Sequence, residues 1–207
     1  MNPNLQKLKL VGLDPSLRNW GVAKGTFDLH SRKLSIDAVE VICPVIHTGK
    51  QVRQNSQDIE AAQQLYAGAI AAVEGAHAVF VEVPVGAQSA RSMASYAICV
   101  GVLGALRHQG HSFFTVTATE VKMASFGSKT ATKKEMIGWA TVKHPEASWP
   151  IHKINGNSLI VEGKAEHMAD AIAAIYAGGQ LPEFRQMLTL MSAFQTKENH
   201  ANLSQTI

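Results

Sequence analysis

The segment that most constrains the fold is LKLVGLDPSLRNWGVA, residues 8–23, because its most apolar run ends with the carboxylate of Asp14. The apolar run predicts a buried β-strand, and the residues after Asp14 predict a tight turn into a second strand. Burying a lone charge costs several kcal/mol unless a neighbour compensates it. A local hydrogen bond, a basic partner or a metal ion could each stabilise this carboxylate, and which of them applies decides what the protein does.

Apolar periodicity along the rest of the chain predicts an alternation of strands and helices. Strands, of which the first three should be antiparallel, are expected at residues 8–13, 20–29, 34–42, 78–83 and 112–117. Helices are expected at residues 56–73, 89–110, 117–127, 132–144 and 165–179, and a hairpin at Asn155-Gly156. This order predicts an α/β fold, with a five-stranded mixed sheet flanked by helices.

Length and composition favour a single globular domain followed by a polar tail. With 207 residues, of which 46% are hydrophobic and 17% charged, the chain can bury a sizeable core. We expect the domain at residues 1–182 and a loosely held tail at residues 183–207, where the sequence turns polar. The net charge of +3 permits a nucleic-acid partner without demanding one.

No stretch of the sequence predicts a membrane anchor or an export signal. The longest apolar run, residues 96–106, is too short to span a bilayer. The amino-terminal residues also lack the apolar core of a signal peptide. These features predict a cytoplasmic protein with no membrane partner.

Four potential metal ligands occur where a core alone would not place polar groups. Asp14 and Glu82 each end an otherwise apolar strand, whereas His167 and Asp170 lie one turn apart on an alanine-rich helix. If the first and fourth strands are neighbours, the helix could cross the sheet and bring its two ligands to the strand carboxylates. Such ligands suit Mg²⁺ or Mn²⁺, and two such ions about 4 Å apart can activate water and hold the leaving oxygen of a phosphodiester.

Each of these residues, taken singly, also has a structural interpretation. Asp14 could cap the turn that follows it, and Glu82 could pair with a buried basic residue. His167 could be a helix-surface histidine, and Asp170 could be half exposed. The combination carries more weight than any member of it, because all four residues fall on elements that can converge.

Three motifs in their order resemble the RuvC-type Holliday junction resolvases, a family with the ribonuclease H-like fold. The motifs are VGLDPSLRNWGVA, VFVEVP and AEHMADAIAA, with the segment VKMASFGSKTATKK between the second and the third. The resemblance covers residues 8–178. It implies a homodimer that nicks four-way (Holliday) DNA junctions symmetrically, with two Mg²⁺ or Mn²⁺ ions in each active site.

The resemblance assigns roles to the four ligands residue by residue. Asp14 corresponds to the first-strand aspartate of the family, Glu82 to the fourth-strand glutamate and Asp170 to the last catalytic aspartate. His167 occupies a position that is aspartate in some members and histidine in others. The resemblance thus implies that these four residues form the catalytic and metal-binding set.

Two lysines complete the site that the resemblance implies. Lys122 and Lys133 lie eleven residues apart, as do two functional lysines of the family. They would hold phosphates near the scissile bond as point charges. A solvated helix face is the alternative for both, since Lys129 and Lys134 lie close to them in the sequence.

Two departures from the family pattern concern substrate geometry. Some members carry a stacking aromatic residue three positions after the glutamate, where this chain has Val85, and residues 151–164 resemble an insertion. A second function also stays open, that of a nuclease-dead protein of the same fold that only binds DNA junctions. The intact carboxylates argue against it, because keeping them together without metal would be costly.

Overall fold

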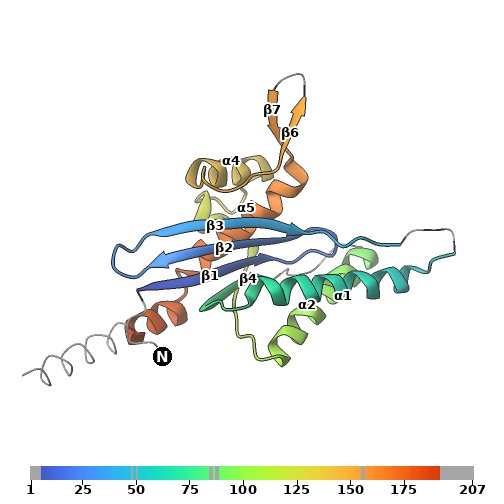
Figure 1. The fold of residues 1–207 in the computed structure, drawn as a ribbon, viewed down its shortest axis with the longest axis horizontal. Helices are drawn as coiled ribbons and strands as arrows, with labels where there is room; N and C mark the ends of the chain where they lie inside the picture. Colours follow the sequence, from blue (N-terminus) through green and yellow to red (C-terminus); the bar gives the residue numbers. More distant parts are fainter. Residues whose placement is uncertain are drawn as a thin grey trace, which may run out of the picture.

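The protein folds around one five-stranded sheet with helices on both faces (Figure 1). The computed structural model describes residues 6–47, 49, 51–83, 86, 89–154 and 157–191, without the side chains of residues 153, 154, 157 and 158. Val85 and the Asn155-Gly156 turn lie outside the described residues. Within the described part of the chain, no helix is long and apolar enough to cross a membrane.

The sheet has the strand order β3-β2-β1-β4-β5. β1 pairs antiparallel with β2, β2 antiparallel with β3, β1 parallel with β4, and β4 parallel with β5. The expected mixed sheet, opened by three antiparallel strands, is therefore confirmed. Its strands are β1 (Lys7–Asp14), β2 (Trp20–Asp28), β3 (Leu34–Ile42), β4 (Ala78–Glu82) and β5 (Phe114–Val116).

Two hydrophobic cores fill the space between the sheet and its helices. One core lies under α1 (Gln54–Val73) and α2 (Ala90–His108). The other lies under α5 (Glu162–Gly178), which crosses the opposite face of the sheet in Figure 1. The shorter helices α3 (Ala118–Ser125) and α4 (Lys133–Lys143) pack on the same side as α5.

The pleat of the two central strands decides where their terminal carboxylates point. Successive side chains of a strand alternate between its two faces. In β1, Leu10 belongs to the core under α5 and Leu13 to the core under α1 and α2. Asp14 lies four residues after Leu10 in β1 and therefore points to the same face, toward α5. Glu82 lies two residues after Phe80 in β4 and points to that face as well. Both carboxylates therefore end on the face that α5 covers.

Two glycines allow the backbone of α5 to lie directly on β1 and β2. A Cβ atom on Gly12 would collide with the carbonyl oxygen of Ala171, and one on Gly21 would collide with that of His167. Neither contact could be relieved by rotating a side chain, since both partners are backbone atoms of α5. The alanines of α5 extend this close approach, because small side chains let a helix and a sheet pack tightly.

The expected carboxyl-terminal tail begins as a packed helix, which we call the C-terminal helix (residues 182–191). Phe184 and Leu188 are buried in the core under α5. The Phe184 ring stands edge-on to Phe80, with centroids 4.9 Å apart. The expectation that the chain is loosely held from residue 183 onward is therefore wrong for residues 183–191, and residues 192–207 lie outside the described part of the chain.

The segment interpreted as an insertion forms a separate two-stranded sheet. Its strands, β6 (Ile151–Ile154) and β7 (Asn157–Ile160), pair antiparallel with each other and not with the main sheet. In Figure 1 this hairpin projects from the body of the protein above α4 and α5. Its placement directly before α5 leaves the core of the fold unchanged.

Replacing Gly12 with alanine tests the contact between α5 and β1. We expect Gly12→Ala to lower the free energy of unfolding by about 3 kcal/mol, because the added methyl group overpacks a backbone contact. Gly104→Ala on α2 is the control, since no atom lies within 4 Å of the added Cβ. That change should be neutral or stabilise by about 0.5–1 kcal/mol. Urea unfolding followed by circular dichroism measures both, and equal behaviour of the two variants would contradict the close packing.

Candidate functional site

The two strand carboxylates lie side by side at the carboxyl ends of β1 and β4. Leu13 pairs with Val81 in the parallel register, which places Asp14 and Glu82 next to each other at the following position. Asp14 contributes repulsion that raises the pKa of Glu82, as expected for neighbouring carboxylates. The pairing of β1 with β4, on which the expected convergence of the ligands depended, is thus present.

α5 adds a histidine and a third carboxylate to this pair. The Nδ1 atom of His167 lies 2.6 Å from Oδ2 of Asp14, and the two side chains are only 17% and 15% exposed. His167 is therefore not a helix-surface residue, and the described partner of Asp14 lies in α5 rather than in the turn after β1. Asp170, one turn further along α5, is close enough to contribute to the raised pKa of Glu82.

Burial and mutual repulsion disfavour the charged forms of two of these carboxylates. Burial, followed by the charges of Asp14 and Asp170, raises the pKa of Glu82 to about 8. Burial, followed by the charge of Asp14, raises the pKa of Asp170 to about 7. Among the described residues, neither Glu82 nor Asp170 forms an ion pair that would offset this cost. The expected pairing of Glu82 with a buried basic residue is thus not observed in the described part of the chain.

The acidic surroundings of His167 have the opposite effect on the imidazole. Burial is the largest single influence and lowers the pKa of His167, since it disfavours the charged ring. The hydrogen bond to Asp14 and the nearby charges of Asp14, Glu166 and Asp170 outweigh burial, and the pKa of His167 is raised above its ordinary value. The three half-buried carboxylates of the site therefore favour the protonated form of this ring.

Both predicted lysines lie at the site, and two helix starts place them there. α3 and α4 each begin with a capping box, in which a threonine and a glutamate bond to each other's backbone N–H groups. Lys122 on α3 is close enough to Glu82 and Asp170 to lower the pKa of both carboxyls. Lys133, the first residue of α4, holds its ammonium 2.6 Å from Oε2 of Glu166. The neighbouring Lys134 instead faces Glu162 at 4.0 Å.

Glu166 is the residue of the site that sequence reasoning missed. Its two carboxylate oxygens face different partners, Nζ of Lys133 at 2.6 Å and Nε2 of His167 at 3.5 Å. The hydrogen bond to Glu166 is the largest cause of the raised pKa of Lys133. A signal for it existed, since Glu166 lies four residues before Asp170 and thus on the same face of a helix. Glu166 therefore joins the α4 lysine to the carboxylate cluster.

The chemistry of this donor set fits a hard divalent cation. Lys122 only partly offsets the repulsion between Glu82, Asp170 and Asp14, and oxygen ligands are those that Mg²⁺ and Mn²⁺ prefer. Among the described residues, no three histidine, cysteine, aspartate or glutamate side chains are grouped closely enough around one point to hold a metal ion. Asp14 and His167 are bonded to each other, so a cation that bound both would replace that hydrogen bond.

The arrangement of strands and helices is shared with solved structures of RuvC. Thermus thermophilus RuvC in complex with Holliday junction substrate matches with a TM-score of 0.57 and 18% identity, over 82% of this chain and 92% of that chain. A second T. thermophilus RuvC structure matches with a TM-score of 0.57 and 20% identity, over the same shares. No protein-family model and no curated protein matches the sequence. The likeness confirms the expected ribonuclease H-like fold.

The raised pKa of Glu82 predicts how a neutral replacement changes stability with pH. Because the folded protein holds a proton that the unfolded chain releases, stability falls as the pH rises from 4.5 toward about 8. Glu82→Gln removes this cost. We therefore expect the variant to raise the melting temperature of the metal-free protein by roughly 5 °C at the upper end of this range and by little at the lower end.

The matched control for this experiment is Glu74→Gln, which changes an exposed carboxylate next to α1. Its effect on the melting temperature should be small and constant over the same pH range. Differential scanning calorimetry in the presence of EDTA measures both variants. A Glu82→Gln effect that does not grow with pH would show that Glu82 is ionised without strain in the folded protein.

Proposed function

We propose that this protein is a metal-dependent endonuclease that nicks branched DNA, with four-way junctions as its main substrate. The observation that carries the proposal is the convergence of Asp14, Glu82, His167 and Asp170 at one edge of the sheet. The RuvC neighbour was solved with a Holliday junction substrate, which supports branched DNA as the substrate class.

The three carboxylates and His167 would hold Mg²⁺ or Mn²⁺, two ions in each site. When bound, such ions lower the pKa of a water and stabilise charge on the phosphate that it attacks. Asp14, Glu82 and Asp170 would orient the cations through oxygen ligands that the fold has already brought together at an energetic cost. Occupation of the site would remove the repulsion that raises the pKa of Glu82 and Asp170, and would release their protons.

The lysines are proposed to position the DNA backbone. Lys122 faces the carboxylates from α3, and Lys133 approaches them from α4 with a side chain that is 79% exposed. An ammonium group binds a phosphate as a point charge and carries no sequence information. The pair would therefore hold the scissile phosphate over the carboxylates without reading the bases.

A junction-binding protein without nuclease activity is the second candidate. The observation that favours it is the direct hydrogen bond between Asp14 and His167. Among the described residues, no three potential ligands are grouped closely enough to hold a metal ion. The raised pKa values of Glu82 and Asp170 favour the enzyme, because binding alone gives no reason to keep two carboxyl groups where burial and repulsion disfavour their charged forms. The cleavage experiment below distinguishes the two candidates directly.

We further propose that two copies of the chain act on one junction. The resemblance to the resolvases implies a homodimer, since two symmetric nicks need two active sites. α2 offers a surface for this contact, because the small residues Ala90, Ala94, Ala97 and Gly101 are all exposed along one helix. Small residues allow two helices to approach closely.

The function is tested by incubating the protein with a labelled four-way junction, a replication fork and a linear duplex. Each substrate is combined with Mg²⁺, Mn²⁺ or EDTA. The proposal predicts nicking of the junction in either metal and none in EDTA, with the linear duplex left intact. Equal cleavage of junction and duplex would contradict the branched substrate, and binding without cleavage in both metals would favour the second candidate.

Replacing Asp14 separates catalysis from binding. We expect Asp14→Asn to lower single-turnover cleavage of the junction by about a thousandfold or more, since a neutral amide is a poor cation ligand. Junction affinity should be kept or increased, because a negative charge near the phosphates is removed. The control is Asp37→Asn on β3, where the exposed carboxylate bonds to Thr26 away from the site. Loss of binding together with cleavage would point to misfolding or to a binding role for Asp14.

The ion pair between Lys133 and Glu166 predicts a coupling that a double-mutant cycle can measure. If Glu166 acts by holding Lys133 in place, Glu166→Gln should slow single-turnover cleavage roughly tenfold in the parent protein, because a misplaced phosphate contact costs rate. In a Lys133→Ala background the same change should have little further effect. Lys134→Ala is the matched control for the lysine. Additive losses from Glu166→Gln and Lys133→Ala would show that Glu166 acts independently of Lys133.

A further inference from the structure

A second concave surface lies at the opposite end of the sheet from the carboxylates. We call it the C-terminal groove, a cavity of about 990 Å³ between the C-terminal helix, the end of α5 and the β2–β3 turn. Its floor is formed by the half-buried Phe27, Leu34 and Tyr176, together with the buried core residues Leu10, Ile175, Phe184 and Leu188. Phe27 pairs with Leu8 near the start of β1, whereas Asp14 ends that strand. Leu10, which lines the groove, lies four residues before Asp14, so the groove is separated from the carboxylate site by about 13 Å of strand.

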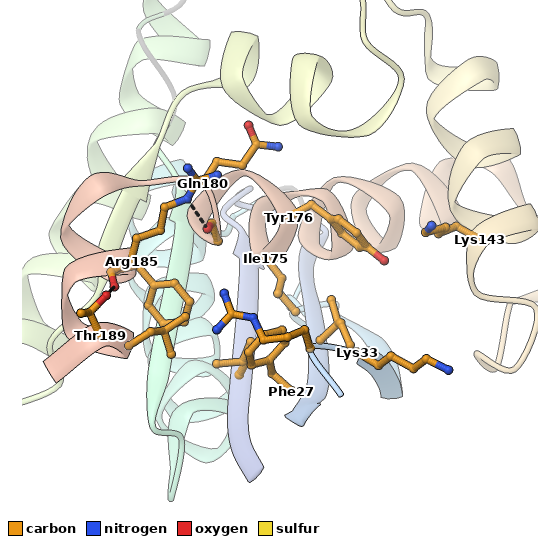
Figure 2. Close-up of a pocket in the computed structure, with 14 residues that line it drawn as sticks. Phe27, Lys33, Lys143, Ile175, Tyr176, Gln180, Arg185 and Thr189 are labelled. Carbon is orange, nitrogen blue, oxygen red and sulfur yellow. Dashed lines mark hydrogen bonds between the residues drawn. The ribbon is translucent and has the colours of Figure 1, made fainter. Parts of the chain in front are cut away.

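The charged residues that line the C-terminal groove are all basic. They are Arg32, Lys33, Lys143 and Arg185, and no aspartate or glutamate is among the 14 lining residues. None of the four forms an ion pair with a described carboxylate. Figure 2 shows Arg185 on one side of the apolar floor and Lys33 with Lys143 on the other, with Phe27 and Ile175 between them. The groove thus presents positive charge on both sides of an apolar surface, with the Arg32 guanidinium over the Phe27 ring between them.

The β2–β3 turn holds its two basic residues in a fixed position. One carboxylate oxygen of Asp28 accepts hydrogen bonds from the backbone N–H groups of His30 and Ser31, at 3.0 and 2.7 Å. Arg32 adopts a φ of 58°, which costs energy for a residue with a side chain and persists only where the surroundings enforce it. The Arg32 guanidinium then lies over the Phe27 ring, 5.7 Å from its centroid. A pre-ordered basic edge loses little entropy when a ligand binds to it.

We propose that the C-terminal groove docks an acidic segment of a partner protein, one that carries large apolar side chains between its carboxylates. Charge complementarity selects an anionic occupant, since every charged lining residue is positive. The apolar floor selects side chains that can fill it, which a compact anion such as phosphate lacks. A nucleic-acid backbone would satisfy the positive edges but would leave the half-buried Leu34 and Tyr176 uncovered in the groove. An acidic, apolar peptide satisfies both features together.

Docking in the C-terminal groove would leave the carboxylate site accessible. The groove contacts α5 at Ile175, Tyr176 and Gly179, near its carboxyl end, whereas His167 and Asp170 lie nearer its start. The two surfaces are thus separated along α5 as well as along β1. The groove is therefore suited to recruiting the protein to a partner rather than to blocking its site. The inference stands whether or not the proposed cleavage is observed.

The test measures binding of a labelled probe peptide to the full-length protein by fluorescence anisotropy. In the probe, glutamates alternate with leucine and phenylalanine. One control peptide carries lysine in place of every glutamate, and a second carries serine in place of every apolar residue. The proposal predicts that the probe binds at least tenfold more tightly than either control, which corresponds to about 1.4 kcal/mol. Equal binding of the probe and the serine peptide would overturn it, because the apolar floor would then contribute nothing.

Charge-reversed variants locate the binding. Arg185→Glu and Lys33→Glu change exposed residues on opposite edges of the groove and should each weaken probe binding on the order of tenfold. Arg53→Glu, an exposed position next to α1, is the matched control and should bind like the parent. Junction cleavage should be unchanged in all three variants. Unchanged probe binding in both groove variants would overturn the proposal.

Two competitors exclude other occupants of the groove. A synthetic peptide of residues 192–207 tests whether the chain's own end fills it, and a linear DNA duplex tests for nucleic acid. The proposal predicts that neither displaces the probe at concentrations at which the unlabelled probe does. If the peptide of residues 192–207 displaces the probe, the groove is occupied by this chain itself. If the DNA duplex displaces the probe from the parent protein but not from Arg185→Glu, the groove binds DNA. Either result would overturn the proposal.

Discussion

The direct contact of the α5 backbone with β1 and β2 is the constraint on which the rest of the structure depends. Gly12 and Gly21 leave no side chain between the helix and the sheet at the two positions where they touch. This contact sets the height and rotation of α5 over the strands, and with them the positions of His167 and Asp170. A helix held further from the sheet would break the 2.6 Å contact between His167 and Asp14.

The same packing makes the site costly for the folded protein. The close packing of α5 on the sheet excludes water from Glu82 and Asp170. Burial is the largest cause of the raised pKa of both carboxyl groups. A chain selected only for stability would replace these groups with apolar residues of similar size. Local costs of this kind concentrate at functional sites, where the surrounding structure keeps them in place. The balance between tight packing and buried charge is thus the physical mark of the site.

Much of the fold could be predicted from the sequence, because strands and helices alternate clearly and the apolar runs end in turn residues. The strand pleat also predicts that Asp14 and Glu82 share a face once β1 and β4 are known to be neighbours. The C-terminal helix was missed because its polar residues hide Phe184 and Leu188, whose spacing of four residues becomes informative only beside Phe80. Glu166 was missed for a similar reason, since its role depends on Lys133, a residue from a different helix. Metal binding stays a prediction, because it depends on distances that no pattern in the sequence encodes.

The central claim is that the carboxylates gathered beneath α5 bind divalent cations, and anomalous diffraction tests it most directly. Crystals of the protein soaked in Mn²⁺ should show anomalous density bounded by the side chains of Asp14, Glu82 and Asp170. Crystals of Asp14→Asn, grown and soaked in the same way, should show less density or none at that position. Mn²⁺ found only at other surfaces, in a parent protein that kept its fold and its contact between His167 and Asp14, would contradict metal binding by these carboxylates.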